Sequence, residues 1–432
     1  MSSLNRGREA RIDSVSCPSP GYCSAGGSFG SRNYGVTYGQ PFVVNEVKGI
    51  WHKAIPVPGM LALNTRKNGF VSSVSCTRPG DCSAGGSYLG RHGPRAFVVD
   101  EVNGRWHRAI TLAITGLGDV EVSALACASP GNCSAGGTNS NGGTTTTKGL
   151  DGTFVVNEVN GRWHKPIIVP GKFTFTYDGR VQSVACPTAG NCTAGGWYLD
   201  GADQYQAFVA SEVNGTWHNY IKVPGTYPNF YGAMIASLSC PKPGYCTVAG
   251  NHGYATAFLA SEANGRWHTA RSVPGLASFH ETGEQVTALS CTWPGECSAG
   301  GWYDDRNKQT RAFVVNEVNG HWHNAISVPG LRNFDHSGTG QVNVLSCARP
   351  GDCSAGGLHY RAPFAQGFVV NEVNGTWHNA IEVPGISALS RSGSSQVTAL
   401  SCARPGHCSA GGYYADKTFG HFAGQVFVVN EG

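Results

Sequence analysis

The stretch Ser346–Gly357, SCARPGDCSAGG, decides the interpretation of this chain. It holds two cysteines six positions apart, with Pro350 and Gly351 between them. The same frame occurs eight times and uses all 16 cysteines of the 432 residues. Because successive pairs begin 51 to 59 residues apart, the chain is predicted to be one array of eight similar units. The pairs are Cys17 with Cys23, Cys76 with Cys82, Cys127 with Cys133, Cys186 with Cys192, Cys240 with Cys246, Cys291 with Cys297, Cys347 with Cys353, and Cys402 with Cys408.

The composition favours strands and tight turns. The chain has 61 glycines, only 3 methionines and 13% charged residues, and no segment keeps a 3.6-residue periodicity. The formal charge of +4 comes without a block of Lys and Arg, so nothing indicates a nucleic-acid partner. The apolar runs are far shorter than the roughly 18 residues of a membrane-spanning helix. We therefore expect no membrane span.

The cysteine pattern predicts a disulfide framework. Paired cysteines at fixed spacing, with none left over, are typical of proteins in an oxidising compartment. The alternative is that the thiols are small buried groups filling the core of each unit. The first ten residues, MSSLNRGREA, lack the apolar segment of a signal peptide. We nevertheless expect an extracellular or cell-surface protein with each disulfide inside one unit.

Each unit is predicted to have four strands, which we name A to D and define in the seventh repeat. Strand A is VNVLSC (residues 342–347), strand B is CSAGGLH (353–359), strand C is FVVNEV (368–373) and strand D is WHNAI (377–381). Pro-Gly between A and B and Asn-Gly between C and D are turn dipeptides, and Asn-Gly suits the type I′ turn of a hairpin. In the A–B hairpin the two cysteines can lie opposite each other, where closing so small a loop contributes roughly 2 kcal/mol.

Four antiparallel strands in a repeat of this length are typical of a β-propeller blade, and an open β-solenoid is the alternative. The chain has eight A–B–C sets but only seven strands D. Seven blades would leave one set unplaced, so we expect an all-β, eight-bladed propeller spanning residues 1–432, with blades starting near residues 12, 71, 122, 181, 235, 286, 342 and 397. The seven strands D begin at Trp51, Trp106, Trp163, Trp217, Trp267, Trp322 and Trp377.

The eighth blade is predicted to be incomplete. Its strand C is followed by Gly432, and only 13 residues precede Ser14 at the other end. The N-terminus can thus add at most part of a fourth strand. We expect residues 427–431 to present an incompletely paired edge, which residues 2–10 or another chain would cover.

The unit resembles the S-V-S-C-x-S-x-G-x-C-x-A-x-G propeller-like repeats of uncharacterised actinobacterial proteins. This resemblance covers nearly the whole chain, and it implies a propeller without an established activity. A more remote similarity, to the Asp-box propellers of sialidases and photosystem assembly factors, rests on SEVNGTW (Ser211–Trp217). That segment is one residue shorter than the Asp box and lacks its aspartate.

A histidine follows the tryptophan of every strand D. Metal ligands must converge on one ion at about 2 Å, whereas outer strands of separate blades point apart, so we expect no metal and no cofactor. Pairing across the C–D hairpin would place Asn45 opposite His52 and Glu46 opposite Trp51. We assign these recurring polar residues to structure. The histidines are His52, His107, His164, His218, His268, His323 and His378.

The B–C and D–A connections carry all the length variation and are predicted to emerge on one face of the blades. Loops on a rigid scaffold commonly carry binding sites. Aromatic residues and acids recur there just after Gly-Gly, and this combination suits a sugar, whose ring stacks while its hydroxyls bond to the acids. The alternative is that the first aromatic of each set packs between blades. The candidate ligand-binding residues are Tyr88, Trp197, Tyr198, Asp200, Trp302, Tyr303, Asp304, Asp305, His359, Tyr360, Tyr413, Tyr414 and Asp416.

Three functions remain open from the sequence. The first is a glycan-binding, lectin-like propeller, and the second is a glycoside-active enzyme with a carboxylate pair on the loop face. The third is a protein-interaction scaffold, which the sequence does not separate from the first. No nucleophile motif, phosphate-binding loop or dinucleotide motif is present. We expect Ala at Trp302 and Tyr303 to weaken binding and leave the melting temperature nearly unchanged.

Overall fold

The computed structural model describes residues 9–33, 36–114, 118–140, 152–171, 178–226, 232–253, 256–335, 338–361, 364–390, 393–416 and 423–431. Its strands form eight antiparallel sheets, one in each repeat. The order is A–B–C followed by the outer strand in the first seven sheets and A–B–C alone in the described part of the eighth. The described helices are single turns. The fold is therefore an eight-bladed, all-β propeller with antiparallel four-stranded blades, as the sequence predicts. We number the blades 1 to 8 along the chain.

The outer strand of a blade is divided into two pieces. In blade 7, β34 (Thr376–Trp377) and β35 (Ile381–Glu382) both pair with β33 (Phe364–Val373). Between them the backbone N–H of His378 donates to the carbonyl oxygen of Asn371 at 2.9 Å. Strand D is thus two short ladders on one neighbour, and the predicted register of Trp opposite Glu and His opposite Asn is confirmed.

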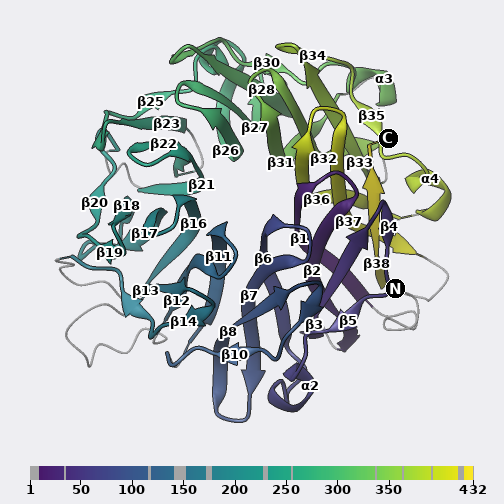
Figure 1. The fold of residues 1–432 in the computed structure, drawn as a ribbon. Helices are drawn as coiled ribbons and strands as arrows, with labels where there is room; N and C mark the ends of the chain where they lie inside the picture. The colour runs from purple at the N-terminus through teal and green to yellow at the C-terminus, as the bar shows by residue number, and fades with distance from the viewer. Residues whose placement is uncertain are drawn as a thin grey trace. The chain divides into compact units, whose positions relative to one another are not determined.

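Residues 56–272 form one compact unit that holds blades 2 to 5. The A strands β6, β11, β16 and β21 of this unit pack on one another in chain order (Figure 1). Its elements are α2 (Met60–Leu63), β6 (Gly69–Arg78), β7 (Asp81–Gly90), β8 (Gly93–Val102), β9 (Arg105–Trp106), β10 (Ile110–Thr111), β11 (Val120–Ser129), β12 (Asn132–Asn139), β13 (Gly152–Val159), β14 (Arg162–Trp163), β15 (Ile167–Ile168), β16 (Gly179–Thr188), β17 (Asn191–Leu199), β18 (Tyr205–Val213), β19 (Thr216–Trp217), β20 (Ile221–Lys222), β21 (Ala233–Lys242), β22 (Tyr245–His252), β23 (Thr256–Ala263), β24 (Arg266–Trp267) and β25 (Arg271–Ser272).

Residues 1–55 and 273–432 form the second compact unit, which holds blades 1, 6, 7 and 8. Here β26, β31, β36 and β1 pack in that order, so the last blade of the chain contacts the first. Its elements are β1 (Glu9–Ser19), β2 (Tyr22–Asn33), β3 (Val36–Val47), β4 (Ile50–Trp51), the blade 1 strand β5 (Ile55–Pro56), η1 (Leu276–Ser278), β26 (His280–Trp293), β27 (Glu296–Asp305), β28 (Thr310–Val318), β29 (His321–Trp322), β30 (Ile326–Ser327), α3 (Arg332–Asp335), β31 (Gly340–Arg349), β32 (Asp352–Arg361), β33, β34, β35, α4 (Ile386–Leu389), β36 (Ser395–Arg404), β37 (His407–Asp416) and β38 (Ala423–Asn430).

Both hairpin turns of a blade have the predicted chemistry. In blade 7, Asn374 and Gly375 have φ values of 49° and 80°, as a type I′ turn requires, and Gly351 after Pro350 has φ 74°. The N–H of Gly375 donates to the carbonyl oxygen of Gly351 at 2.8 Å, which ties the two turns together. The Asn-Gly and Pro-Gly dipeptides therefore support each other in every repeat where they occur.

The core consists of apolar layers between neighbouring blades. The phenylalanine of strand C is almost fully buried in blades 1 to 7, for example Phe313 and Phe368. The serine before the first cysteine also links blades, since the Ser346 hydroxyl accepts the N–H of Cys402 at 3.1 Å. The SC…CSAGG motif therefore bonds to the next copy of itself, which helps to explain its repetition.

A second link between blades joins polar side chains, and we call it the interblade clamp. It consists of the Asn of strand C and the Glu and Trp of the following blade. In blades 6 and 7, Asn316 Nδ2 donates to Glu372 Oε1, and Trp377 Nε1 donates to Asn316 Oδ1 at 3.1 Å. The Glu372 side chain is buried, with 2% of its surface exposed. The Asn and Glu sets are thus structural, whereas the His378 side chain is exposed and lies outside the clamp.

Blade 8 has three strands among the described residues, in the order β36–β37–β38. Among the described residues its outer strand β38 pairs with β37 alone, while β1 belongs to the sheet of blade 1 and packs against blade 8. The clamp recurs here, because Asn430 donates to Glu46 and Trp51 Nε1 donates to Asn430 Oδ1 at 3.3 Å. Blades 8 and 1 are therefore joined by side chains. The predicted cover of this edge by residues 2–10 lies largely outside the described residues.

All eight predicted disulfides are present, each inside one blade, so the prediction of a disulfide framework is confirmed. In blade 7, Cys347 and Cys353 occupy directly opposed positions of the β31–β32 ladder. The alternative of buried free thiols is wrong, because every cysteine is bonded. The bonds join Cys17 to Cys23, Cys76 to Cys82, Cys127 to Cys133, Cys186 to Cys192, Cys240 to Cys246, Cys291 to Cys297, Cys347 to Cys353, and Cys402 to Cys408.

We expect the double substitution Cys347→Ala and Cys353→Ala to lower the free energy of unfolding by about 2 kcal/mol, since the released loop is short. Urea unfolding of the oxidised proteins measures this change. A loss near zero would show that the turn hydrogen bonds alone hold the hairpin.

Candidate functional site

The aromatic candidates occupy the first two positions after Gly-Gly in strand B, except Tyr360, which occupies the third. In blade 6 these are Trp302, which is half-buried, and Tyr303, whose side chain is only 4% exposed. The Tyr303 ring packs 6.5 Å from the Phe313 ring, and its hydroxyl hydrogen-bonds with Ser327 at 2.6 Å. The second ring is therefore part of the core. The expectation that Ala at both positions leaves stability unchanged is wrong for this reason.

The second position is enclosed in other blades too. Tyr88 is 5% exposed and bonds to Thr111 at 2.8 Å, and His359 is 1% exposed. Tyr198 and Tyr414 are half-buried, as are Trp197 and Tyr413 at the first position, whereas Tyr360 is exposed. The side chain of Asp416 lies outside the described residues. The candidates are spread over blades 2, 4, 6, 7 and 8, and whether they bind a ligand stays a prediction.

The acids of strand B organise the turn that follows them. Asp305 Oδ1 accepts the backbone N–H groups of Asn307 at 2.8 Å and Gln309 at 3.1 Å. In blade 4, Asp200 accepts two backbone N–H groups of its own turn in the same way. Asp304 accepts the hydroxyl of Thr310 at 3.0 Å. These carboxylates therefore hold the B–C connections in place.

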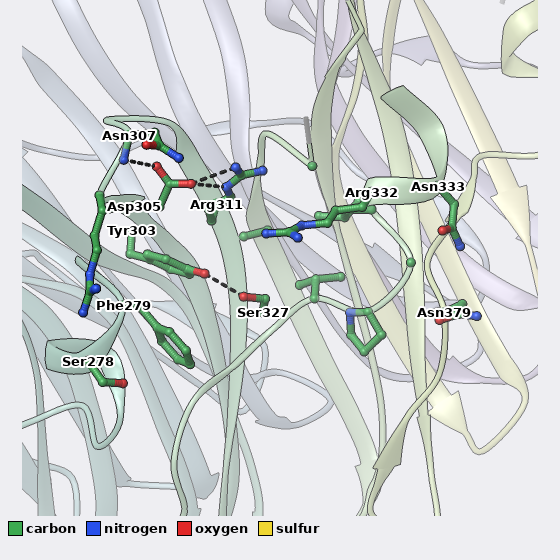
Figure 2. Close-up of a pocket in the computed structure, with 17 residues that line it drawn as sticks. Ser278, Phe279, Tyr303, Asp305, Asn307, Arg311, Ser327, Arg332, Asn333 and Asn379 are labelled. Atoms are coloured by element: carbon green, nitrogen blue, oxygen red, sulfur yellow. Dashed lines mark hydrogen bonds and ion pairs between the residues drawn. The ribbon is translucent and has the colours of Figure 1, made fainter. Parts of the chain in front are cut away.

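One pocket of about 580 Å³ lies beside this turn of blade 6. Its walls come from the B–C turn, from the D–A connection around α3, and from Asn379 in blade 7. Tyr303 and Phe279 line one side, with their rings stacked at 5.4 Å. Figure 2 shows the Arg332 side chain extending from α3 across the pocket, between Arg311 and Ser327. Of the candidate residues, Tyr303 and Asp305 line this pocket.

Arg311 is the most unusual group in the pocket. It is 8% exposed, and its Nε and Nη2 atoms both contact Asp305 Oδ2, at 2.8 and 2.7 Å. Its Nη1 atom is buried and has no hydrogen-bond partner among the described residues. A buried charged donor without a partner is costly. An anionic or hydroxyl group placed in the pocket would satisfy it.

The pairing of Arg311 also fixes the charge of Asp305. Burial alone would raise the pKa of Asp305, but hydrogen bonds from the Gln309 N–H and the Arg311 side chain outweigh it and hold the pKa below its usual value. Asp305 is therefore ionised at neutral pH and is not a proton donor. The pocket is lined by an ion-paired carboxylate, arginines, amides and aromatic rings. Such groups suit the binding of a polar ligand.

Arg311, Arg332 and Asn379 were not predicted from the sequence. A comparison of the repeats could have narrowed the choice to two residues, because the position two before the Phe of strand C is Gln206 in blade 4 and Gln366 in blade 7 but arginine in blades 2 and 6, as Arg95 and Arg311. Gln206 donates to Asp200 at 2.7 Å, as Arg311 does to Asp305. Arginine adds one more donor group to this pair, in a residue that lines the pocket.

Comparisons with known proteins place the fold. No protein-family model and no curated protein sequence matches the chain, so the resemblance to actinobacterial repeats has no further support. Solved structures do match it. Sqt1 of Chaetomium thermophilum, bound to the N-terminus of ribosomal protein L10, shares 12% identity at a TM-score of 0.54, over 98% of this chain and 97% of its own.

Two carbohydrate-related proteins are among the similar structures. The GH74 xyloglucanase of Xanthomonas campestris has 12% identity and a TM-score of 0.50, over 85% of this chain and 53% of its own. The BP39L lectin of Burkholderia pseudomallei has 16% identity and a TM-score of 0.49, over 86% and 99%. The likeness to the xyloglucanase shows the fold alone. The chain spans about half the length of the xyloglucanase.

The described residues contain no group of three or more His, Cys, Asp or Glu side chains arranged to hold a metal ion. Within the same residues no helix has the length and hydropathy needed to cross a bilayer. Eight disulfides indicate an oxidising environment.

Proposed function

We propose that this chain is a secreted or cell-surface carbohydrate-binding propeller, and that the blade 6 pocket accepts a sugar bearing an acidic group. The observation that carries the proposal is the buried Nη1 of Arg311, which has no hydrogen-bond partner among the described residues and belongs to a residue that lines the pocket. Arginine binds carboxylates and sulfates well because its planar fork donates to two oxygens at once.

The rest of the pocket suits a sugar ring. Its volume of about 580 Å³ is within the range of small-molecule sites. Asn333 and Asn379 offer amides to hydroxyl groups, and the edge of the Tyr303–Phe279 stack offers an apolar wall. A xyloglucanase is among the proteins of similar fold, which agrees with a carbohydrate ligand. The argument for an acidic sugar comes from the residues that line the pocket.

Glycoside cleavage is the less favoured alternative. A hydrolase needs one carboxyl group that is protonated near neutral pH and a second that is free to act. Asp305 has a lowered pKa and is bound by Arg311, while Asp304 accepts a hydrogen bond from Thr310. Asp305, the acid that lines the pocket, therefore lacks the properties of the proton donor.

We expect Arg311→Gln to weaken the binding of uronic-acid or sulfated glycans at least tenfold, a loss of about 1.4 kcal/mol. Glutamine at this position would keep the kind of bond to Asp305 that Gln206 makes to Asp200, and would remove only the cationic donor. The measurement is a glycan array followed by calorimetry on the best acidic glycan. Circular dichroism checks that the fold is kept.

The matched control is Arg95→Gln, which changes the equivalent position of blade 2. Tyr88 faces Arg95 in blade 2 as Tyr303 faces Arg311 in blade 6. This control should bind as the wild type does. Undiminished binding by the Arg311→Gln variant would refute the proposed site, and capture of acidic peptides without any glycan would favour the protein-interaction alternative.

A further inference from the structure

Blade 2 departs from the interblade clamp at one residue. The clamp position is asparagine in five blades and serine in blades 4 and 5. In blades 3, 6, 7 and 8 the asparagine amide donates to the glutamate of the next blade. The distance from Asn371 Nδ2 to Glu431 Oε1 is 2.6 Å. In blade 2 the same position is Asp100, and the glutamate that follows it is Glu158. A carboxylate cannot donate, so this clamp lacks its central hydrogen bond.

The substitution leaves two carboxyl groups side by side. Asp100 accepts the Nε1–H of Trp163 at 2.9 Å and the hydroxyl of Ser83. Glu158 is 4% exposed, and its Oε2 has no hydrogen-bond partner among the described residues. In Glu46 and Glu372 the Oε2 atom also lacks a partner among those residues, but their Oε1 accepts the clamp amide. In blade 2 Asp100 stands in place of the asparagine that would supply this amide, so Glu158 lies beside a second acid.

A cavity opens at this clamp. It measures about 530 Å³ between blades 2 and 3, whereas the equivalent groove at the Asn316–Glu372 clamp measures about 60 Å³. Both Asp100 and Glu158 line the larger cavity. The other charged and titratable groups that line it are Arg78, Asp81, Glu101, His107 and Arg108.

The cations of the cavity wall do not replace the missing donor. Arg78 Nε contacts Asp81 Oδ2 at 2.8 Å, so that pair is neutral. His107 lies near enough for its charge to lower the pKa of Asp100, but burial dominates and raises that pKa overall. Burial and the Asp100 charge together raise the pKa of Glu158 to about 8. Near neutral pH Glu158 is therefore protonated. The cavity beside it is large enough to hold a ligand.

We propose that the cavity between blades 2 and 3 binds a small organic cation whose N–H groups bridge Asp100 and Glu158 in place of the clamp amide. A primary ammonium or a guanidinium group supplies both the positive charge and several donors. A bare metal ion fits less well, because no group of three ligating side chains occurs among the described residues. Binding releases the Glu158 proton, so the affinity should fall roughly tenfold for each pH unit below the pKa of Glu158.

The test uses n-butylammonium as the probe and tetramethylammonium, which carries the same charge without N–H donors, as its control. At pH 8.5 and constant ionic strength, n-butylammonium should shift the NMR signals of residues around Glu158 and raise the melting temperature. Tetramethylammonium should do neither. At pH 6.5 the n-butylammonium affinity should be at least tenfold weaker.

Two variants separate this site from general charge effects. Asp100→Asn introduces the asparagine that blades 1, 3, 6, 7 and 8 have at this position, so it should fold well and lose n-butylammonium binding at least tenfold. Glu158→Gln should lose both the binding and its pH dependence. Equal binding of the two probes, unchanged binding in Asp100→Asn, or no binding to the wild type at 50 mM would each overturn the proposal. Circular dichroism and urea unfolding check that both variants keep the fold.

Discussion

Replacing Gly357 by alanine is expected to destabilise the protein by at least about 3 kcal/mol. A methyl carbon on Gly357 would lie 1.9 Å from the carbonyl oxygen of Gln341 in the neighbouring strand. Strand β31 bulges between Val342 and Val344, and this bulge brings the carbonyl against the glycine. Because the obstacle is backbone, the two strands would have to move apart. Urea unfolding of the two proteins measures the loss.

The control is Gly367→Ala in the same blade. Gly367 is buried as well, but a methyl carbon there would lie 3.4 Å from the flexible end of Val383. Blades 2 and 6 already have alanine at this position, Ala96 and Ala312. We expect a change smaller than about 1 kcal/mol, partly because alanine restricts the unfolded chain. Similar losses at both positions would show that strand packing tolerates the close approach.

The Gly357 environment also shows what the sequence could predict. The paired turns, the cysteine register and the count of eight strand sets depend on contacts inside one repeat, and these predictions are confirmed. The glycine equivalent to Gly357 recurs in every blade, and each one faces a carbonyl oxygen of strand A within 2.1 Å of a built methyl carbon. The bulge that causes this close approach depends on how strands A and B pair, which the sequence of one repeat does not show.

Contacts between repeats were harder to predict. The clamp joins an Asn to a Glu of the next repeat, and nothing in the local pattern of Asn316 indicates Glu372 as its partner. The same limit applies to the candidate site. Alternation along strand B separates Trp302 from Tyr303, but which of the two faces the core depends on the neighbouring sheet. Arg311 was missed because its Nη1 donor matters for binding only beside a pocket. That pocket is formed in part by the D–A connection, whose conformation the sequence does not show.

The substitution Asn316→Leu should lower the free energy of unfolding by about 3 kcal/mol near pH 6, and by more near pH 8.5. Leucine removes the donor to Glu372 and the acceptor for Trp377, and each buried polar group left without a partner costs about 1–3 kcal/mol. Burial raises the pKa of Glu372 to about 7, while the Asn316 amide acts to lower it. Without the amide this pKa should rise further.

The direction of the pH dependence follows from that shift. A carboxyl group whose pKa is raised in the folded state contributes stability below its unfolded value, near 4.5, and this contribution is lost as the pH rises through the folded pKa. The wild type should therefore lose stability from about pH 5 to pH 8, and Asn316→Leu should lose more of it between pH 7 and 9. Adding Glu372→Gln to the variant removes the ionising group, so the double variant should show no extra loss at high pH. Denaturant unfolding at pH 6, 7.5 and 8.5 compares the three proteins, and a parallel loss in both variants at every pH would mean that Glu372 is not the group that titrates.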